Sequence, residues 1–66
     1  MQIRVDRSLP IALSVQIQGQ IVYAISTGML QVGERLPSTR ELAATLRVAP
    51  MTVSQVYRHL AQQGVV

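Results

Sequence analysis

Apolar residues recur at intervals of three and four positions between residues 10 and 27, which predicts an amphipathic helix over this segment. Ser8 supplies a side chain that can cap a helix, and Pro10 suits a first helical turn because proline has no amide to satisfy. Gly28 follows the segment and can adopt the left-handed conformation that ends many helices. The inward face of this helix is expected to carry Leu13, Ile17, Ile21, Ala24 and Ile25.

Two shorter helices are predicted over residues 39–47 and 50–63, joined by a tight turn. Ser38 and Glu41 have the spacing of a capping box, in which each side chain accepts a hydrogen bond from the other residue's backbone amide. Pro50 suits the first position of the second of these helices. The two apolar stripes consist of Leu42, Ala43 and Leu46 in the first helix and Val53, Val56, Tyr57 and Leu60 in the second.

The segments outside the helices also show patterns. Residues 1–7 alternate between apolar and polar side chains, which predicts a short extended arm. Residues 29–37 hold several apolar side chains, so we expect this loop to fold against the core. A chain of 66 residues is limited to one small domain. We therefore expect residues 1–66 to form a single all-α domain, a three-helix helix-turn-helix with an N-terminal arm.

The composition excludes several classes of protein. Apolar residues make up 48% of the chain, which is typical of a globular protein, and no apolar run is long enough to span a membrane. The chain has no cysteine and a single histidine, His59, so we expect neither a metal site nor a cofactor. The first residues lack the apolar segment of a secretory signal, and we therefore expect the protein in the cytoplasm.

The charge of the chain allows a polyanionic partner. The formal net charge is +3, and every basic residue is an arginine. The guanidinium group presents a planar fork of donors that suits phosphates and guanine edges. Residues 38–66 carry three arginines against one carboxylate, that of Glu41, so the two shorter helices are the more basic part.

The two shorter helices form a helix-turn-helix, an arrangement that can place its second helix in the major groove of DNA. The exposed start of that helix carries short uncharged side chains. Gln55 can pair with adenine, and Met51 can lie against a thymine methyl group. Arg58 lies further along and would meet the DNA backbone. At the start of the preceding helix, residues 38–40 surround free amides that favour a phosphate.

Each of these residues also has a purely structural interpretation. Ser38 is explained mainly as a helix cap, with a phosphate contact as a secondary role. Arg40 is explained as a solvated surface residue. Tyr57 has the spacing of a packed core residue rather than of a base-stacking platform, and His59 that of a surface residue. The joint pattern carries more weight than any single residue.

The joint pattern resembles the N-terminal winged helix-turn-helix domain of the GntR family of bacterial transcription regulators. The resemblance rests on Leu36-Pro37-Ser38-x-Arg40-x-Leu42-Ala43 and on Thr52-Val53-x-x-x-Tyr57, and it covers nearly the whole chain from Ser8 onward. Ala49-Pro50-Met51 departs from the Ser-Arg that often precedes the threonine in this family, which removes a frequent arginine contact. A proline at this place is similar to the YtrA-like subgroup, where Asn-Pro-Asn precedes Thr-Val.

The resemblance implies a dimeric regulator, a repressor in our expectation, that binds a palindromic operator in double-stranded DNA with its third helix in the major groove. In such proteins the arginine that matches Arg40 contacts DNA, and the residue that matches Thr52 contacts a phosphate. With the residues singled out above, the expected DNA-binding set is Ser38, Thr39, Arg40, Ala49, Pro50, Met51, Thr52, Ser54, Gln55 and Arg58.

The family also implies parts that these residues do not contain. A two-stranded β wing is expected after Gly64, and a C-terminal domain would bind an effector ligand and support the homodimer. Since the sequence ends at Val66, we expect a winged-helix fold whose wing is truncated and whose effector domain is missing.

The alternative to DNA binding is a protein-interaction or dimerisation module that uses the same helices without DNA contact. An exposed apolar patch at Ile11, Val15, Val22 and Met29 would favour that alternative. An exposed polar face at Ser38, Thr39, Arg40 and Thr52 would favour DNA. An enzyme is not expected, because the three carboxylates are scattered and the sequence has neither a phosphate-binding glycine loop nor a nucleophile beside a base.

Overall fold

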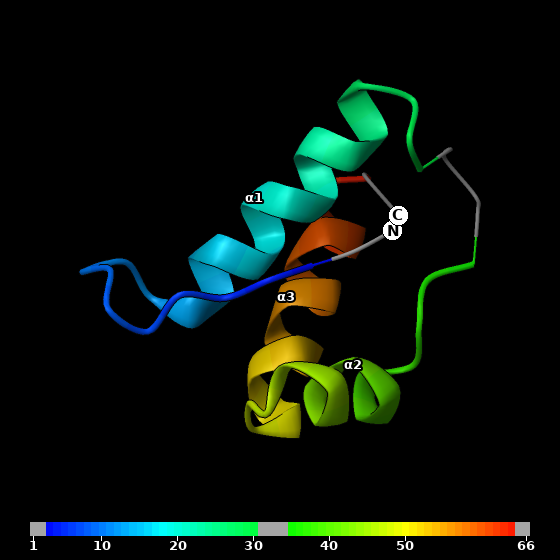
Figure 1. The fold of residues 1–66 in the computed structure, drawn as a ribbon. Coiled ribbons are helices and arrows are strands. Elements are labelled where there is room, and N and C mark those ends of the chain that lie inside the picture. The colour runs from blue at the N-terminus through cyan, green and yellow to red at the C-terminus, as the bar shows by residue number, and fades with distance from the viewer. Residues whose placement is uncertain (1–2, 31–34, 65–66) are drawn as a thin grey trace.

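The computed structural model describes residues 3–30 and 35–64 and contains three helices (Figure 1). α1 spans Leu13–Ser26, α2 spans Thr39–Leu46, and α3 spans Pro50–Gln62. Figure 1 shows α3 between the other two helices, and it packs against both of them. The described residues contain no strand, so the predicted all-α class is confirmed.

The core is centred on the contact between α1 and α3. The side chains with less than 2% exposure come from these two helices: Ile17, Ile21, Val53, Val56 and Leu60. α2 adds Leu42, Ala43 and Leu46, and the segments outside the helices add Ile3 and Leu30. Because α3 buries one face against two helices, its opposite face is the one that remains available to a partner.

α1 begins later than the sequence predicts, at Leu13 instead of about Pro10. The reason is that Ser8 does not cap a helix. Its hydroxyl and its amide both donate to the Asp6 carboxylate, at 2.6 and 2.9 Å, and so they close a turn that precedes the helix. The residue that occupies the cap position is Ala12, which has no side-chain hydrogen bond to offer.

α2 begins as the capping pattern predicts. The Ser38 hydroxyl oxygen accepts a hydrogen bond from the Glu41 amide at 3.1 Å. The reciprocal half of the predicted capping box is not found: among the described residues, no hydrogen bond joins the Glu41 carboxylate to the Ser38 amide. One hydrogen bond of the cap is therefore present, and the Glu41 carboxylate remains as a negative charge near the positive end of the helix.

α2 ends in a left-handed turn that the sequence does not signal. Arg47 has φ +57°, the only non-glycine residue with positive φ in the described part of the chain. The amide of Val48 donates to the carbonyl of Ala43 at 3.0 Å, and the amide of Arg47 to that of Ala44 at 3.4 Å. This pair of hydrogen bonds is the Schellman arrangement, in which glycine usually occupies the left-handed position.

The other helix ends match the glycine signals. Gly28 and Gly64 have φ of +81° and +74° and follow α1 and α3, as predicted. After Gly28, the amide of Leu30 donates to the carbonyl of Ala24 at 3.0 Å, which returns Leu30 to the core. The loop is only partly folded inward, because Met29 is exposed, and its residues 31–34 lie outside the described part of the chain.

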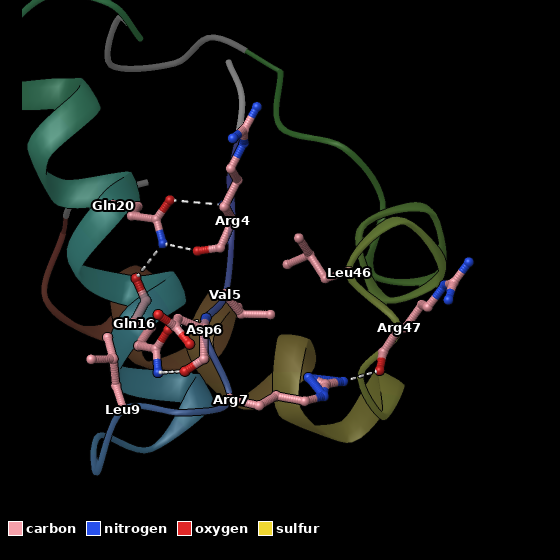
Figure 2. Close-up of a pocket in the computed structure, with 9 residues that line it drawn as sticks. All are labelled: Arg4, Val5, Asp6, Arg7, Leu9, Gln16, Gln20, Leu46 and Arg47. Atoms are coloured by element: carbon pink, nitrogen blue, oxygen red, sulfur yellow. Dashed lines mark hydrogen bonds between the residues drawn. The ribbon is translucent and has the colours of Figure 1, made fainter.

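The N-terminal arm runs along α1 and is held there by two glutamines (Figure 2). The Gln20 side-chain oxygen accepts from the Arg4 amide at 2.9 Å, and its nitrogen donates to the Arg4 carbonyl. One helical turn earlier, Gln16 makes the same pair of hydrogen bonds with the backbone of Asp6, at 2.8 and 3.0 Å. The predicted arm is thus present over residues 3–6, while residues 1–2 lie outside the described part.

Candidate nucleic-acid interface

The exposed face of α3 lies opposite its buried face. Met51, Gln55 and Arg58 are all exposed and follow one another at intervals of four and three residues, so they share one side of the helix. Met51 is 65% exposed, so its apolar side chain is open to a partner. These three predicted residues therefore form one surface.

Two hydroxyl residues flank this surface on opposite sides. Thr52 and Ser54 are half-buried, and neither hydroxyl has a hydrogen-bond partner within the described residues. The Thr52 amide donates to the carbonyl of Ala49 at 3.0 Å and closes the first turn of α3. Ala49 and Pro50 are exposed and small, so a partner can approach the start of this helix closely.

The start of α2 supplies the second predicted group. Ser38 and Arg40 are exposed, and Thr39 is half-buried. The hydroxyl oxygen of Ser38 already accepts the hydrogen bond that caps α2, so the helix-cap role expected for this residue is present. The Arg40 guanidinium makes no hydrogen bond within the described part of the chain, and a positive charge at the start of a helix is poorly placed for the helix dipole.

A hydrogen bond that the sequence did not reveal joins the two groups. The Tyr57 hydroxyl donates to the carbonyl of Pro37 at 2.7 Å, which fixes the start of α2 beside the middle of α3. Tyr57 is half-buried, and its pKa is raised, first by burial and second by the charge of Glu41. The spacing of Tyr57 correctly indicated a packed aromatic, but only the fold shows the carbonyl that its hydroxyl meets.

Other predicted surface features fall elsewhere. His59 is exposed and lies with Gln55 along a shallow groove against Ser14 and Gln18 of α1. Gln55 therefore lies at the α1 edge of the exposed face of α3. The residues that the structure describes contain no cluster of three histidine, cysteine or carboxylate side chains that could hold a metal ion.

A separate apolar surface covers the outer side of α1. The four residues that would favour a protein-interaction role are all exposed: Ile11, Val15, Val22 and Met29. Tyr23 joins them, and most of this set lines a groove of about 460 Å³.

None of the helices in the described part of the chain has the length and apolar character required to cross a membrane.

Comparison with known proteins identifies the family to which this chain is similar. The chain matches the family described as "Bacterial regulatory proteins, gntR family" over residues 13–66. It is 38% identical over 64 residues to the HTH-type transcriptional regulator Rv1152 of Mycobacterium tuberculosis, and 33% identical over 64 residues to the HTH-type transcriptional repressor YtrA of Bacillus subtilis. Each alignment covers 97% of this chain, but 53% and 49% of the respective relative, so the chain spans about half the length of these proteins.

A solved structure shows the same fold. YtrA from Sulfolobus acidocaldarius, a GntR-family transcription factor, superposes with a TM-score of 0.87 and 39% sequence identity, covering 94% of this chain and 66% of that one. The family and these relatives are transcription regulators, which confirms the expectation that the chain is not an enzyme. The predicted resemblance is also confirmed, and the chain belongs to the GntR family as a helix-turn-helix domain of a transcription regulator.

Proposed function

We propose that this domain binds double-stranded DNA in a sequence-specific way, with α3 in the major groove. The observation that carries this proposal is the exposed face of α3, where Met51 and Gln55 stand at the start of the helix and Arg58 follows on the same side. A recognition helix reads bases with its N-terminal residues, and uncharged side chains of this size can reach base edges.

The other residues of the expected set are proposed as contacts to the DNA backbone. Arg40 offers a guanidinium that makes no hydrogen bond within the described residues, at the start of α2, where Ser38 and Thr39 also lie. Thr52 and Ser54 flank the reading face with hydroxyls that are available for phosphates. Ala49 and Pro50 contribute little side-chain bulk, so the helix can enter the groove closely. Contacts to phosphates fix the register of the domain, and contacts to bases select the sequence.

The regulator is proposed to act as a homodimeric repressor on a palindromic operator in the cytoplasm. Support comes from the name of one relative, the repressor YtrA of Bacillus subtilis. Two half-sites that are bound by linked domains raise the affinity through effective concentration, which a single small domain cannot achieve. The effector ligand of such a regulator would bind outside these 66 residues.

A second role, self-association, is favoured by one observation, the exposed apolar face of α1. Val15 of α1 and Met29 of the loop that follows it are 58% and 67% exposed, and a protein-interaction module requires an exposed apolar patch of this kind. We propose a second copy of this chain as its partner, since α1 carries no charged residue and two copies would bring no like charges together. This face is separate from the exposed face of α3, so both roles are compatible.

The self-association is tested by sedimentation equilibrium. Val15→Glu places a charge on the exposed apolar face and is expected to weaken any dimer, and Gln18→Glu adds the same charge elsewhere on α1 as the matched control. If the chain remains monomeric at high concentration, with or without DNA, self-association is contradicted. That outcome does not bear on the proposal that the domain binds DNA.

DNA binding is tested with a pool of random duplexes, by fluorescence anisotropy at low and at physiological salt, followed by selection of the bound sequences. Enrichment of a half-site, alone or as an inverted repeat, supports a sequence reader and reveals its symmetry. Binding that enriches no sequence and disappears with salt reflects charge alone and contradicts sequence-specific reading. The absence of binding at low salt contradicts DNA binding altogether.

A further inference from the structure

A groove of about 810 Å³ separates the N-terminal arm from the end of α2 (Figure 2). Among the described residues that line it, three are arginines, Arg4, Arg7 and Arg47, and one is a carboxylate, Asp6. That carboxylate already accepts two hydrogen bonds from Ser8, which lower the pKa of Asp6. The groove and its rim therefore carry an excess of positive charge from residues that are far apart in the sequence, and Figure 2 shows the Arg47 guanidinium on the side of the rim that faces away from the arm.

Arg7 is oriented by the end of α2. Its guanidinium donates a hydrogen bond to the backbone carbonyl of Arg47, as Figure 2 shows. A guanidinium has five N–H donors, so this one hydrogen bond fixes its direction and leaves the others for a ligand. Arg7 is exposed, and it forms no ion pair within the described residues.

Arg47 occupies a backbone conformation that disfavours any side chain. Its φ of +57° lies in the left-handed region, where glycine is the residue of lowest cost. Its side chain is exposed and makes no hydrogen bond within the described part of the chain, so packing does not explain an arginine there. The Schellman hydrogen bonds account for the left-handed backbone at this position, and the exposed side chain is left available to a partner.

The groove also lies close to the surface proposed for DNA. Arg47 precedes Pro50 by three residues, so their Cα atoms are at most about 11 Å apart. We propose that Arg7 and Arg47 each bind a backbone phosphate of the same duplex whose bases α3 reads, one on each side of the end of α2 (Figure 2). This inference rests on the proposed function, and it adds the arm to the DNA-binding surface. Guanidinium forks match phosphate oxygens in charge and in geometry.

The test is the salt dependence of binding to a mixed-sequence duplex of about 20 base pairs, because each phosphate contact adds about 0.9 to the slope of log affinity against log salt. We expect Arg7→Gln and Arg47→Gln each to lower the slope by about 0.9, so that the affinity lost between about 50 and 200 mM salt shrinks about 3.5-fold. Arg7→Lys keeps the charge and is expected to retain the slope. Arg35→Gln removes one exposed arginine outside the groove and controls for net charge.

The outcomes separate this inference from the proposed function. If Arg40→Gln lowers the slope while Arg7→Gln and Arg47→Gln keep it, the groove binds no phosphate. The proposal that the helices bind DNA is then still supported. An equal loss of slope in Arg35→Gln assigns the effect to total charge and overturns the inference. If the unmodified chain binds no duplex at low salt, the proposed function itself fails. Should Arg7→Gln not fold, Arg47→Gln still decides, since the Arg47 side chain makes no hydrogen bond among the described residues.

Discussion

The side-chain amide of Gln16 and the backbone of Asp6 are joined by two hydrogen bonds, of 2.8 and 3.0 Å. The amide nitrogen donates to the C=O and the amide oxygen accepts from the N–H of a single residue, as a neighbouring strand would. Gln20 repeats this pattern with Arg4 one helical turn later. A helix surface therefore replaces a sheet edge as the partner of the extended arm, and it places Arg7 beside the end of α2.

The first prediction concerns the attachment of the arm. Gln16→Ala and Gln20→Ala each remove hydrogen bonds to the arm and are expected to cost about 0.5–1.5 kcal/mol of unfolding free energy, because the exposed backbone groups exchange their partners for water. Hydrogen exchange should show faster exchange of the Asp6 amide in the first variant and of the Arg4 amide in the second. Gln18→Ala, on the same helix and without a hydrogen bond to the arm, is the control. Unchanged exchange at both amides contradicts the pairing.

The second prediction concerns the pH dependence given by Tyr57. Its pKa is raised, so the folded state favours the neutral hydroxyl. The associated stability is fully present below the unfolded pKa of about 10 and is lost as the pH rises through the higher folded pKa. Tyr57→Phe is expected to abolish this loss and to cost about 0.5–1.5 kcal/mol at neutral pH through the hydrogen bond to Pro37.

Absorbance titration in the Tyr23→Phe variant checks this directly, because Tyr57 is then the one tyrosine left to titrate. Denaturant unfolding of the parent, Tyr23→Phe and Tyr57→Phe from neutral pH to above pH 10 gives the stability side. If Tyr57→Phe loses stability with alkaline pH as steeply as the parent, the tyrosine is not the group responsible.

Local rules predicted the helix ends at which no nearby side chain competes for the capping residue. The serine cap of α2 and the glycines after α1 and α3 depend on residues within one turn, and they are where the sequence places them. The start of α1 was wrong because Ser8 had two partners within reach, and the Asp6 carboxylate competed successfully with the helix amides.

The candidate site was predictable to the same degree. The helical spacing of Met51, Gln55 and Arg58 placed them on one face, which the structure shows to be exposed. The contact between Tyr57 and Pro37 spans 20 residues, and the contact between Arg7 and Arg47 spans 40. No local pattern encodes which carbonyl a distant side chain meets, so both required the fold.

The third prediction separates stability from binding at Arg47. Arg47→Gly relieves the left-handed backbone, for which a side chain costs about 1–2 kcal/mol, but it adds flexibility to the unfolded chain. A net gain of about 0.5–1 kcal/mol in unfolding free energy is expected from denaturant titration. The same variant should lose affinity for DNA if the groove binds a phosphate. Asparagine tolerates the left-handed region better than arginine does, so the unfolding free energy of Arg47→Asn should fall between those of the parent and Arg47→Gly.

The fourth prediction concerns Arg40. Arg40→Ala is expected to weaken binding to all duplexes by similar factors and to lower the salt slope by about 0.9, as the loss of one phosphate contact requires. Arg40 makes no hydrogen bond within the described residues, so stability should change by less than about 0.5 kcal/mol. Anisotropy titrations at several salt concentrations give the slope, and an unchanged slope removes Arg40 from the surface proposed for DNA.

The fifth prediction concerns Gln55, which is expected to read a base. A base contact discriminates by about 1–3 kcal/mol, whereas the affinity for unrelated duplexes depends mainly on phosphates. Gln55→Ala should therefore change the sequence that is selected from a random pool while leaving low-salt binding to mixed duplexes nearly unchanged. Gln62→Ala, in the last turn of the same helix, serves as the matched control, because the bases are read from the first turns. If both variants select the sequence preferred by the parent, Gln55 only borders the groove towards α1 and its amide is not part of the reading surface.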